Sequence, residues 1–151
     1  MEFRLRPDSN FINESDWQGL HTLSLHWKSD LAFYMDELRF LRKLIDKYFV
    51  WLMEDESVKS TQDLLNRLTK IHYRAEDIVS SIEKHVKHIV KEMKFPLVKN
   101  DSTFRKEHAE LENLVTTFLK DFRQLKKEVF ELTENVMVEE KIKHLIARYD
   151  D

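Results

Sequence analysis

The sequence predicts an all-α fold, an elongated antiparallel three-helix bundle whose long helices run up, down and up. The chain of 151 residues holds one glycine and two prolines, whereas a β-rich fold needs turn residues about every ten residues. Apolar residues also recur at seven-residue spacing over long stretches, which is typical of long helices that pack side by side. We predict an N-terminal arm at residues 1–14 and one helical bundle domain at residues 15–151.

Charge and composition exclude several classes of partner and chemistry. Lysine and arginine number 25 against 28 aspartate and glutamate residues, a net charge of −3, so the basic surplus that binding to nucleic acid phosphates requires is missing. The absence of cysteine excludes disulfides and thiolate chemistry. The N-terminus has no apolar run like a signal peptide and no run long enough to span a membrane. We therefore expect a cytoplasmic protein that binds neither nucleic acid nor membrane.

The first helix is expected from Trp17 to Met53, after a capping box formed by Ser15 and Gln18. No proline interrupts this stretch, and Gly19 lies in its first turn. Apolar residues alternate at steps of three and four along it and define one buried stripe, which we call a seam. The seam comprises Leu20, Trp27, Leu31, Tyr34, Leu38, Leu41, Ile45, Tyr48 and Leu52.

The C-terminal end of this first helix, Tyr48 to Met53, is apolar on every side. A helix in a simple bundle needs only one apolar stripe. This end must therefore be covered from more than two directions or contact another chain. We predict a contact surface at Phe49, Val50, Trp51 and Met53, used by a protein partner or by a second copy in a homo-oligomer.

The second helix is expected from an N-cap at Ser60 to about Met93. Its predicted seam, flanked by Leu64, Ile71 and Ile78, is Leu65, Leu68, His72, Ala75, Val79, Ile82, Val86, Ile89 and Met93. Pro96 ends this helix, and capping residues near Asp101 begin the third.

The third helix has a predicted seam that changes register near its end. The residues of this seam are Phe104, His108, Leu111, Val115, Phe118, Phe122, Leu125, Val129, Leu132 and Val136. A new apolar line then starts at Val138, which predicts a stutter or a kink near Thr133 to Asn135. We expect the segment from Val136 to Tyr149 to cover the apolar end of the first helix, as a straight extension or as a short kinked fourth helix.

Histidine and glutamate pairs at helical spacing suggest an alternative role as a metal-binding bundle. His72 with Glu76 and His108 with Glu112 are four residues apart, and His85 with His88 three apart, so each pair shares a helix face. Counting along the three helices places His26, His85, His88 and His108 in one layer. Together with Glu112 they are candidate ligands for Fe or Zn. The alternative is that His72 and His108 are core or boundary residues satisfied by hydrogen bonds, and no cofactor is bound.

The segment Phe104 to Val115, FRKEHAELENLV, resembles the last motif of hemerythrin-type bundles, a histidine in an E-H-x-x-L context. The resemblance implies a helical bundle that binds metal through histidine and glutamate. The chain departs from that family elsewhere, because no break separates His72 from His85. Glycine-rich phosphate loops, cysteine nucleophiles and G-x-S-x-G elbows are absent from the sequence. We expect a non-enzymatic helical bundle that acts by protein contact.

Overall fold

The computed structural model describes residues 17–53, 57–94 and 101–149, the last with side chains from 105 to 138. These ranges form helices α2 (Trp17–Lys47), α3 (Phe49–Leu52), α4 (Ser57–Lys94) and α5 (Asp101–Tyr149), and no strand. The prediction of an all-α helical bundle is confirmed. The predicted arm at 1–14 and the cap at Ser15 lie outside the described residues, and the domain division stays a prediction.

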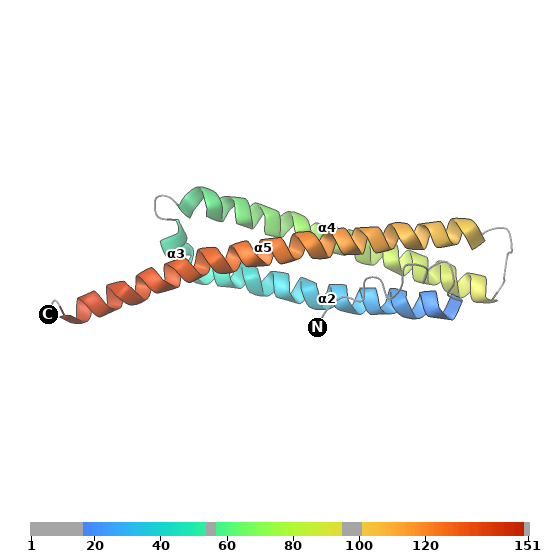
Figure 1. The fold of residues 1–151 in the computed structure, drawn as a ribbon, viewed down its shortest axis with the longest axis horizontal. Coiled ribbons are helices and arrows are strands. Elements are labelled where there is room, and N and C mark those ends of the chain that lie inside the picture. Colours follow the sequence, from blue (N-terminus) through green and yellow to red (C-terminus); the bar gives the residue numbers. More distant parts are fainter. Residues whose placement is uncertain (1–16, 54–56, 95–100, 150–151) are drawn as a thin grey trace.

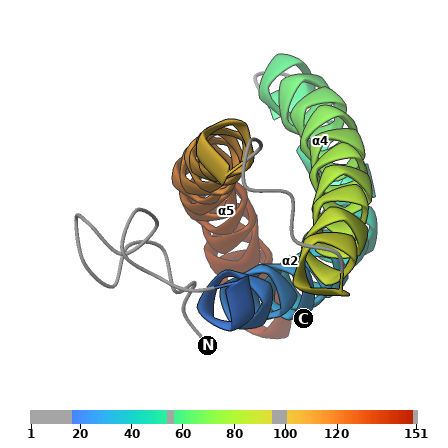
Figure 2. The ribbon, with the colours of Figure 1, turned by 90° about the vertical axis from the view of Figure 1, so that its right-hand side faces the viewer.

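The three long helices lie side by side in an elongated antiparallel arrangement. Helices α2 and α5 run in the same direction and α4 runs in the opposite one (Figure 1). Helix α4 packs along both of its neighbours, whereas α2 and α5 touch less extensively. Viewed along the rod, the three helices surround a common centre (Figure 2). At a rise of 1.5 Å per residue, the 38 residues of α4 span about 57 Å.

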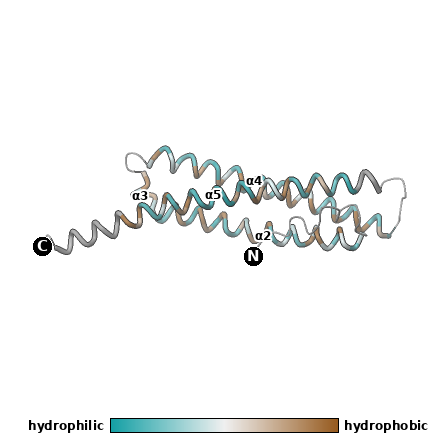
Figure 3. The backbone as a smooth tube through the Cα atoms, in the orientation of Figure 1, coloured by the Kyte–Doolittle hydropathy of each residue, from teal (hydrophilic) through white to brown (hydrophobic). Residues whose placement is uncertain are grey.

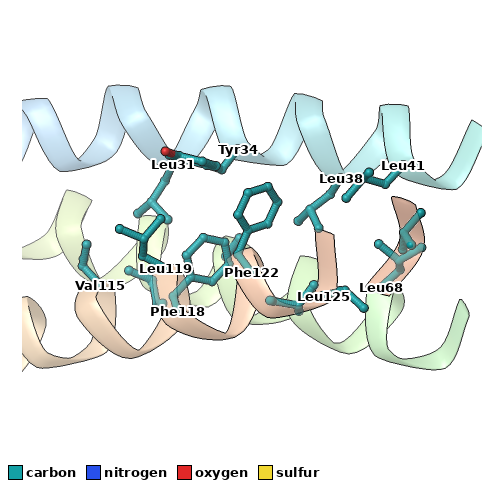
Figure 4. Close-up of a cluster of buried hydrophobic side chains, with 14 of the residues drawn as sticks. Leu31, Tyr34, Leu38, Leu41, Leu68, Val115, Phe118, Leu119, Phe122 and Leu125 are labelled. Atoms are coloured by element: carbon teal, nitrogen blue, oxygen red, sulfur yellow. The ribbon is translucent and has the colours of Figure 1, made fainter. Parts of the chain in front are cut away.

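The predicted seam of α2 is confirmed, since all nine of its residues are buried. Near the middle of the rod, Leu31 and Tyr34 of α2 lie over Phe118 and Phe122 of α5 (Figure 4). The edge of the Tyr34 ring meets the Phe122 ring with centroids 4.8 Å apart, a favourable aromatic geometry. Figure 3 shows the resulting pattern, in which hydrophobic and hydrophilic residues alternate in short stretches along each long helix.

The predicted seam of α4 is wrong at alternate positions. The buried residues follow a strict three-and-four spacing through Thr61, Leu64, Leu68, Ile71, Ala75, Ile78, Ile82, His85, Ile89 and Glu92. The predicted members Leu65, His72, Val79, Val86 and Met93 lie on the flank, where none is buried. The predicted stripe and the buried stripe of this helix share every second position and differ by one residue at the others. The buried stripe contains three polar residues. A count of apolar residues therefore favoured the wrong stripe.

Helix α5 is continuous from Asp101 to Tyr149. The C-terminal segment is thus a straight extension, the first of the two predicted forms, and a kink near Thr133 to Asn135 is not confirmed. The register change is absorbed within the helix, because Thr133 is buried and Leu132 only partly so. The Thr133 hydroxyl donates to the Val129 carbonyl at 2.9 Å, which satisfies it in the core. The end of α5 runs straight past the other helices (Figure 1). The side chains expected to cover α3 from Ile142 onward lie outside the described residues.

The short extra helix of the fold is α3, which follows α2 instead of ending the chain. The first helix was predicted to reach Met53, but α2 ends at Lys47. The Tyr48 N–H donates to the Ile45 carbonyl at 3.2 Å, a tight three-residue turn. Past this break, Tyr48 and Leu52 still reach the core. Helix α4 then begins at Ser57, three residues before the predicted cap.

Ion pairs between helices fix the axial register. Lys28 of α2 pairs with Glu83 of α4 at 3.3 Å. Arg74 of α4 pairs with Asp121 of α5 at 2.7 Å, and Lys126 of α5 with Glu37 of α2 at 2.9 Å. Exposed pairs of this kind each contribute at most about 1 kcal/mol, so they select the register more than they stabilise the fold. In the part of the chain that the structure describes, no helix is long and apolar enough to cross a membrane.

The central aromatic cluster is expected to dominate the stability of the bundle. Replacing the fully buried Phe122 by alanine should lower the free energy of unfolding by about 3–5 kcal/mol, because the change removes apolar contacts and leaves a cavity. Tyr73, which is 61% exposed, is the matched control, and Tyr73→Ala should cost less than about 0.5 kcal/mol. Urea unfolding followed by circular dichroism measures both. Equal losses would contradict the described core.

Candidate functional site

Polar side chains in the core gather at one end of the bundle. The described buried polar or charged residues are Ser24, Asp30, Thr61, His85, Glu92, His108, Glu112 and Thr133. Thr61 and Thr133 belong to the end near α3, where each hydroxyl donates to a backbone carbonyl. The other six lie where the N-terminal half of α2, the C-terminal part of α4 and the N-terminal part of α5 meet. This concentration of buried polar groups makes that end the candidate site.

A chain of hydrogen bonds joins Glu107, His85 and His108, which we call the histidine relay. The Oε1 atom of Glu107 lies 2.7 Å from Nδ1 of His85. The Nε2 atom of His85 lies 2.7 Å from Nδ1 of His108. Both rings are fully buried, whereas the Glu107 side chain is 44% exposed. The relay therefore runs from solvent into the core.

The chemistry of the partners fixes where the protons lie when both rings are neutral. A carboxylate only accepts hydrogen bonds, so the Nδ1–H of His85 donates to Glu107. A neutral imidazole has one N–H, hence Nε2 of His85 accepts and the Nδ1–H of His108 donates to it. This leaves Nε2 of His108 as an acceptor. Among the described residues it has no hydrogen-bond partner, although it is buried.

Burial keeps both rings neutral. Desolvation lowers the pKa of His85 from 6.5, partly offset by the hydrogen bond to Glu107. Desolvation lowers the pKa of His108 to about 3, and repulsion from His85, when that ring is protonated, and from Arg105 acts in the same direction. On the other face of His108, the Trp27 ring of α2 stacks with centroids 4.8 Å apart and planes inclined by 27°. Trp27 thus links α2 to the relay.

Further titratable groups extend the relay on α4. The Nδ1 atom of His88 lies 3.9 Å from Oε1 of Glu107, and its Nε2 lies 3.8 Å from Oε1 of Glu92. His88 is 36% exposed and Glu92 only 3%. Spacing of three residues places His85 and His88 on one face, so both can approach the same carboxylate. Glu107 is therefore the group that the two α4 histidines share.

Three members of the predicted layer of histidines lie close together in the structure. His85, His88 and His108 meet around Glu107, and His26 is next in sequence to Trp27, which contacts His108. His26 itself is half-buried on α2. The rotation about α4 was mispredicted, since His85 lies on the seam.

His72 and Glu112, two further predicted site positions, differ in their surroundings. His72, predicted on the seam, lies on the flank and pairs with Glu76 at 3.0 Å. Glu112 is buried one turn after His108. The H-x-x-x-E pair of His72 is thus a surface pair, whereas that of His108 lies inside the core.

Metal ligation at the relay would compete with its hydrogen bonds. The described residues include no group of three or more histidine, cysteine, aspartate or glutamate side chains positioned to hold a metal ion. Both nitrogens of His85 are already engaged, so ligation by this ring would break a hydrogen bond. Nε2 of His108 is the nitrogen available as a ligand or as an acceptor for one hydrogen-bond donor.

Sequence reasoning missed Glu107 and Glu92 as members of the site. Glu107 directly precedes His108, yet its neighbour His85 lies on another helix, and that contact depends on the rotation of α4. The spacing Ile78, Ile82, His85, Ile89 continues to Glu92 and is the signal that places both polar residues in the core. Trp27 was correctly predicted as a core residue but not as a stacking partner.

The predicted contact surface lies at the opposite end of the rod, on α3. Phe49 is 42% exposed and Val50 70% exposed. Trp51 and Met53 are partly buried, and the Trp51 ring lies 6.1 Å from that of Tyr48. We call Phe49 and Val50 the α3 tip.

Comparisons with protein families, with curated proteins and with solved structures found no match to this chain.

Acid should destabilise the fold through the histidine relay. The pKa values of both rings are lowered in the folded protein, whereas each histidine of the unfolded chain has its ordinary pKa of 6.5. Below pH 6.5 the unfolded chain therefore binds more protons than the folded protein. Stability should therefore be unaffected by the relay above pH 6.5 and fall as the pH drops from 6.5 toward 3. Between pH 6.5 and about 5.5 the loss should be about 1 kcal/mol for His108, and His85 should add a loss of the same sign.

Urea unfolding at several pH values measures this slope. The variant His85→Leu with His108→Phe should flatten it, whereas His72→Gln, a change at the exposed flank, should retain it. A wild-type slope that is flat over this range would contradict the buried neutral pair, even if the double variant does not fold.

Proposed function

We propose that this protein is a non-enzymatic helical bundle that acts through protein contact, binding a second copy of itself or a protein partner with the α3 tip. The observation that carries the proposal is the exposure of Phe49 and Val50 on a one-turn helix at the end of a rod. Both side chains are already partly covered, so burying the rest would contribute less than the about 1.5–3 kcal/mol that full burial of such a side chain gives.

The residues that border the α3 tip enlarge the proposed contact surface. Trp51 and Met53 are partly buried and border the two exposed side chains. Large aromatic residues and methionine are enriched in protein interfaces. Helix α3 is drawn mainly in the hydrophobic colour, next to the more hydrophilic start of α4 (Figure 3). An apolar patch with a polar border is the usual composition of such a surface.

The proposal includes a cytoplasmic location and excludes nucleic acid and membranes as partners. A net charge of −3 supports the exclusion of nucleic acid. The absence of cysteine is compatible with a reducing compartment. The lack of glycine-rich loops and nucleophile motifs supports a role without catalysis.

Sedimentation of the protein over a range of concentrations tests self-association at the tip. We expect the mean mass to rise above 18.4 kDa as the concentration increases. Val50→Asp should weaken association by about 30-fold, since it places a charge in the apolar contact. Leu114→Asp, on α5 at a residue 48% exposed, is the matched control and should leave the mass unchanged. Val50→Asp sedimenting like the wild type would contradict a contact between copies at the tip.

A transition-metal bundle is the second candidate, supported by the acceptor Nε2 of His108 and the adjacent His85 and His88. The candidate ligands remain His26, His85, His88, His108 and Glu112, and the metal would be Fe or Zn. Elemental analysis of protein purified without a histidine tag, followed by titration with Zn²⁺, separates the two candidates. We expect substoichiometric metal, because ligation by His85 would break the relay. Stoichiometric Zn²⁺ binding that His108→Phe removes would replace the first candidate by the second.

A further inference from the structure

A second apolar surface lies away from the α3 tip, on the side where α2 and α5 meet. Phe33 and Phe40 of α2 are 40% and 55% exposed, and Phe130 of α5 is 39% exposed. We call these three residues the aromatic stripe. None of them is among the buried residues of α2 or α5, so the core of one chain does not explain them.

An ion pair holds the two halves of the stripe together. Glu37 follows Phe33 by four residues and precedes Phe40 by three, so all three share one face of α2. Lys126 Nζ donates to Oε1 of Glu37 at 2.9 Å. The same Nζ lies 6.0 Å from the centre of the Phe130 ring. The aromatic stripe is therefore one surface with a negative and a positive group near its middle.

The charged residue and the exposed aromatic residue follow each other in the same order along α2 and along α5. Helices α2 and α5 run parallel (Figure 1), and Glu37 is level with Lys126 because they are paired. Phe40 lies three residues beyond Glu37, and Phe130 lies four residues beyond Lys126. Each helix thus carries a charge followed by an exposed ring at the same level, with opposite signs of charge. A surface with this pattern is complementary to itself.

We propose that a second copy of the chain binds the aromatic stripe, with a two-fold axis parallel to the helices. Under this symmetry α2 of one copy lies against α5 of the other. Glu37 then faces the partner's Lys126, and Phe40 faces the partner's Phe130. A two-fold axis perpendicular to the helices at the level of the ion pair would instead place Glu37 against Glu37 of the partner subunit, which is unfavourable. Charge complementarity therefore selects a parallel dimer.

This inference rests on the proposed function only in that both involve contact between copies. It uses a different surface, near the middle of the rod, and the two surfaces can be tested separately. The parallel arrangement leaves the α3 tips of both copies at the same end of the dimer, where they remain open to further contact.

Charge reversal on either side of the stripe tests the proposal. In Glu37→Lys both positions are positive, and in Lys126→Glu both are negative, so each variant alone repels its own copy. We expect the dissociation constant of each to rise by about 10- to 100-fold. An equimolar mixture of the two variants should form a heterodimer with affinity close to the wild type, because every facing pair is then of opposite sign. Sedimentation velocity with one variant fluorescently labelled measures this.

Two further variants keep the test decisive if charge reversal disturbs the fold. Phe40→Ser should weaken the dimer, whereas Tyr73→Ser, on the exposed face of α4, should not. Wild-type protein that stays monomeric at the highest concentration, or a mixture that does not associate, would overturn the proposed dimer. Association that Val50→Asp abolishes and the stripe variants leave intact would overturn the stripe and retain the tip.

Discussion

The alternation of buried residues at steps of three and four is the constraint on which the structure depends. It gives each long helix one narrow stripe to bury, and three such stripes close around a common core. The bundle is long because the spacing continues along α2, α4 and much of α5. Apolar burial supplies the stabilising free energy, while the weak surface ion pairs only select the register that the seams allow.

The same spacing forces polar groups inside at one end. His85 occupies a seam position between Ile82 and Ile89, so it is buried whatever its chemistry. A buried polar group without a partner costs about 1–3 kcal/mol, and His108 opposite it removes that cost for two nitrogens. Sliding α5 along α4 by one heptad would separate the rings and leave both unpaired. The histidine relay therefore disfavours shifted registers that an entirely apolar seam would tolerate.

The buried seam of a helix could be predicted from the sequence only where a single apolar stripe was present. The seam of α2 was predictable because all nine predicted positions carry apolar residues. The seam of α4 was not, since Leu65 and Val79 lie beside Leu64 and Ile78, and the true stripe passes through His85. Counting residues along the helices still brought His85 level with His108, because axial position does not depend on rotation. The contacts of the histidine rings do depend on the rotation of each helix about its axis, so Glu107 could not be identified as the partner of His85.

A bundle of three helices buries one face of each and leaves the opposite faces to solvent. Phe40 and Phe130 lie off the seams, yet they are aromatic and flank an ion pair that bridges α2 and α5. Because these two helices touch less extensively than either touches α4, their outer faces together form the open side of the bundle. Packing another pair of helices on that side would give α2 and α5 a second seam. The polar end then restricts how one chain folds, and the aromatic side is the face that we propose a second copy covers.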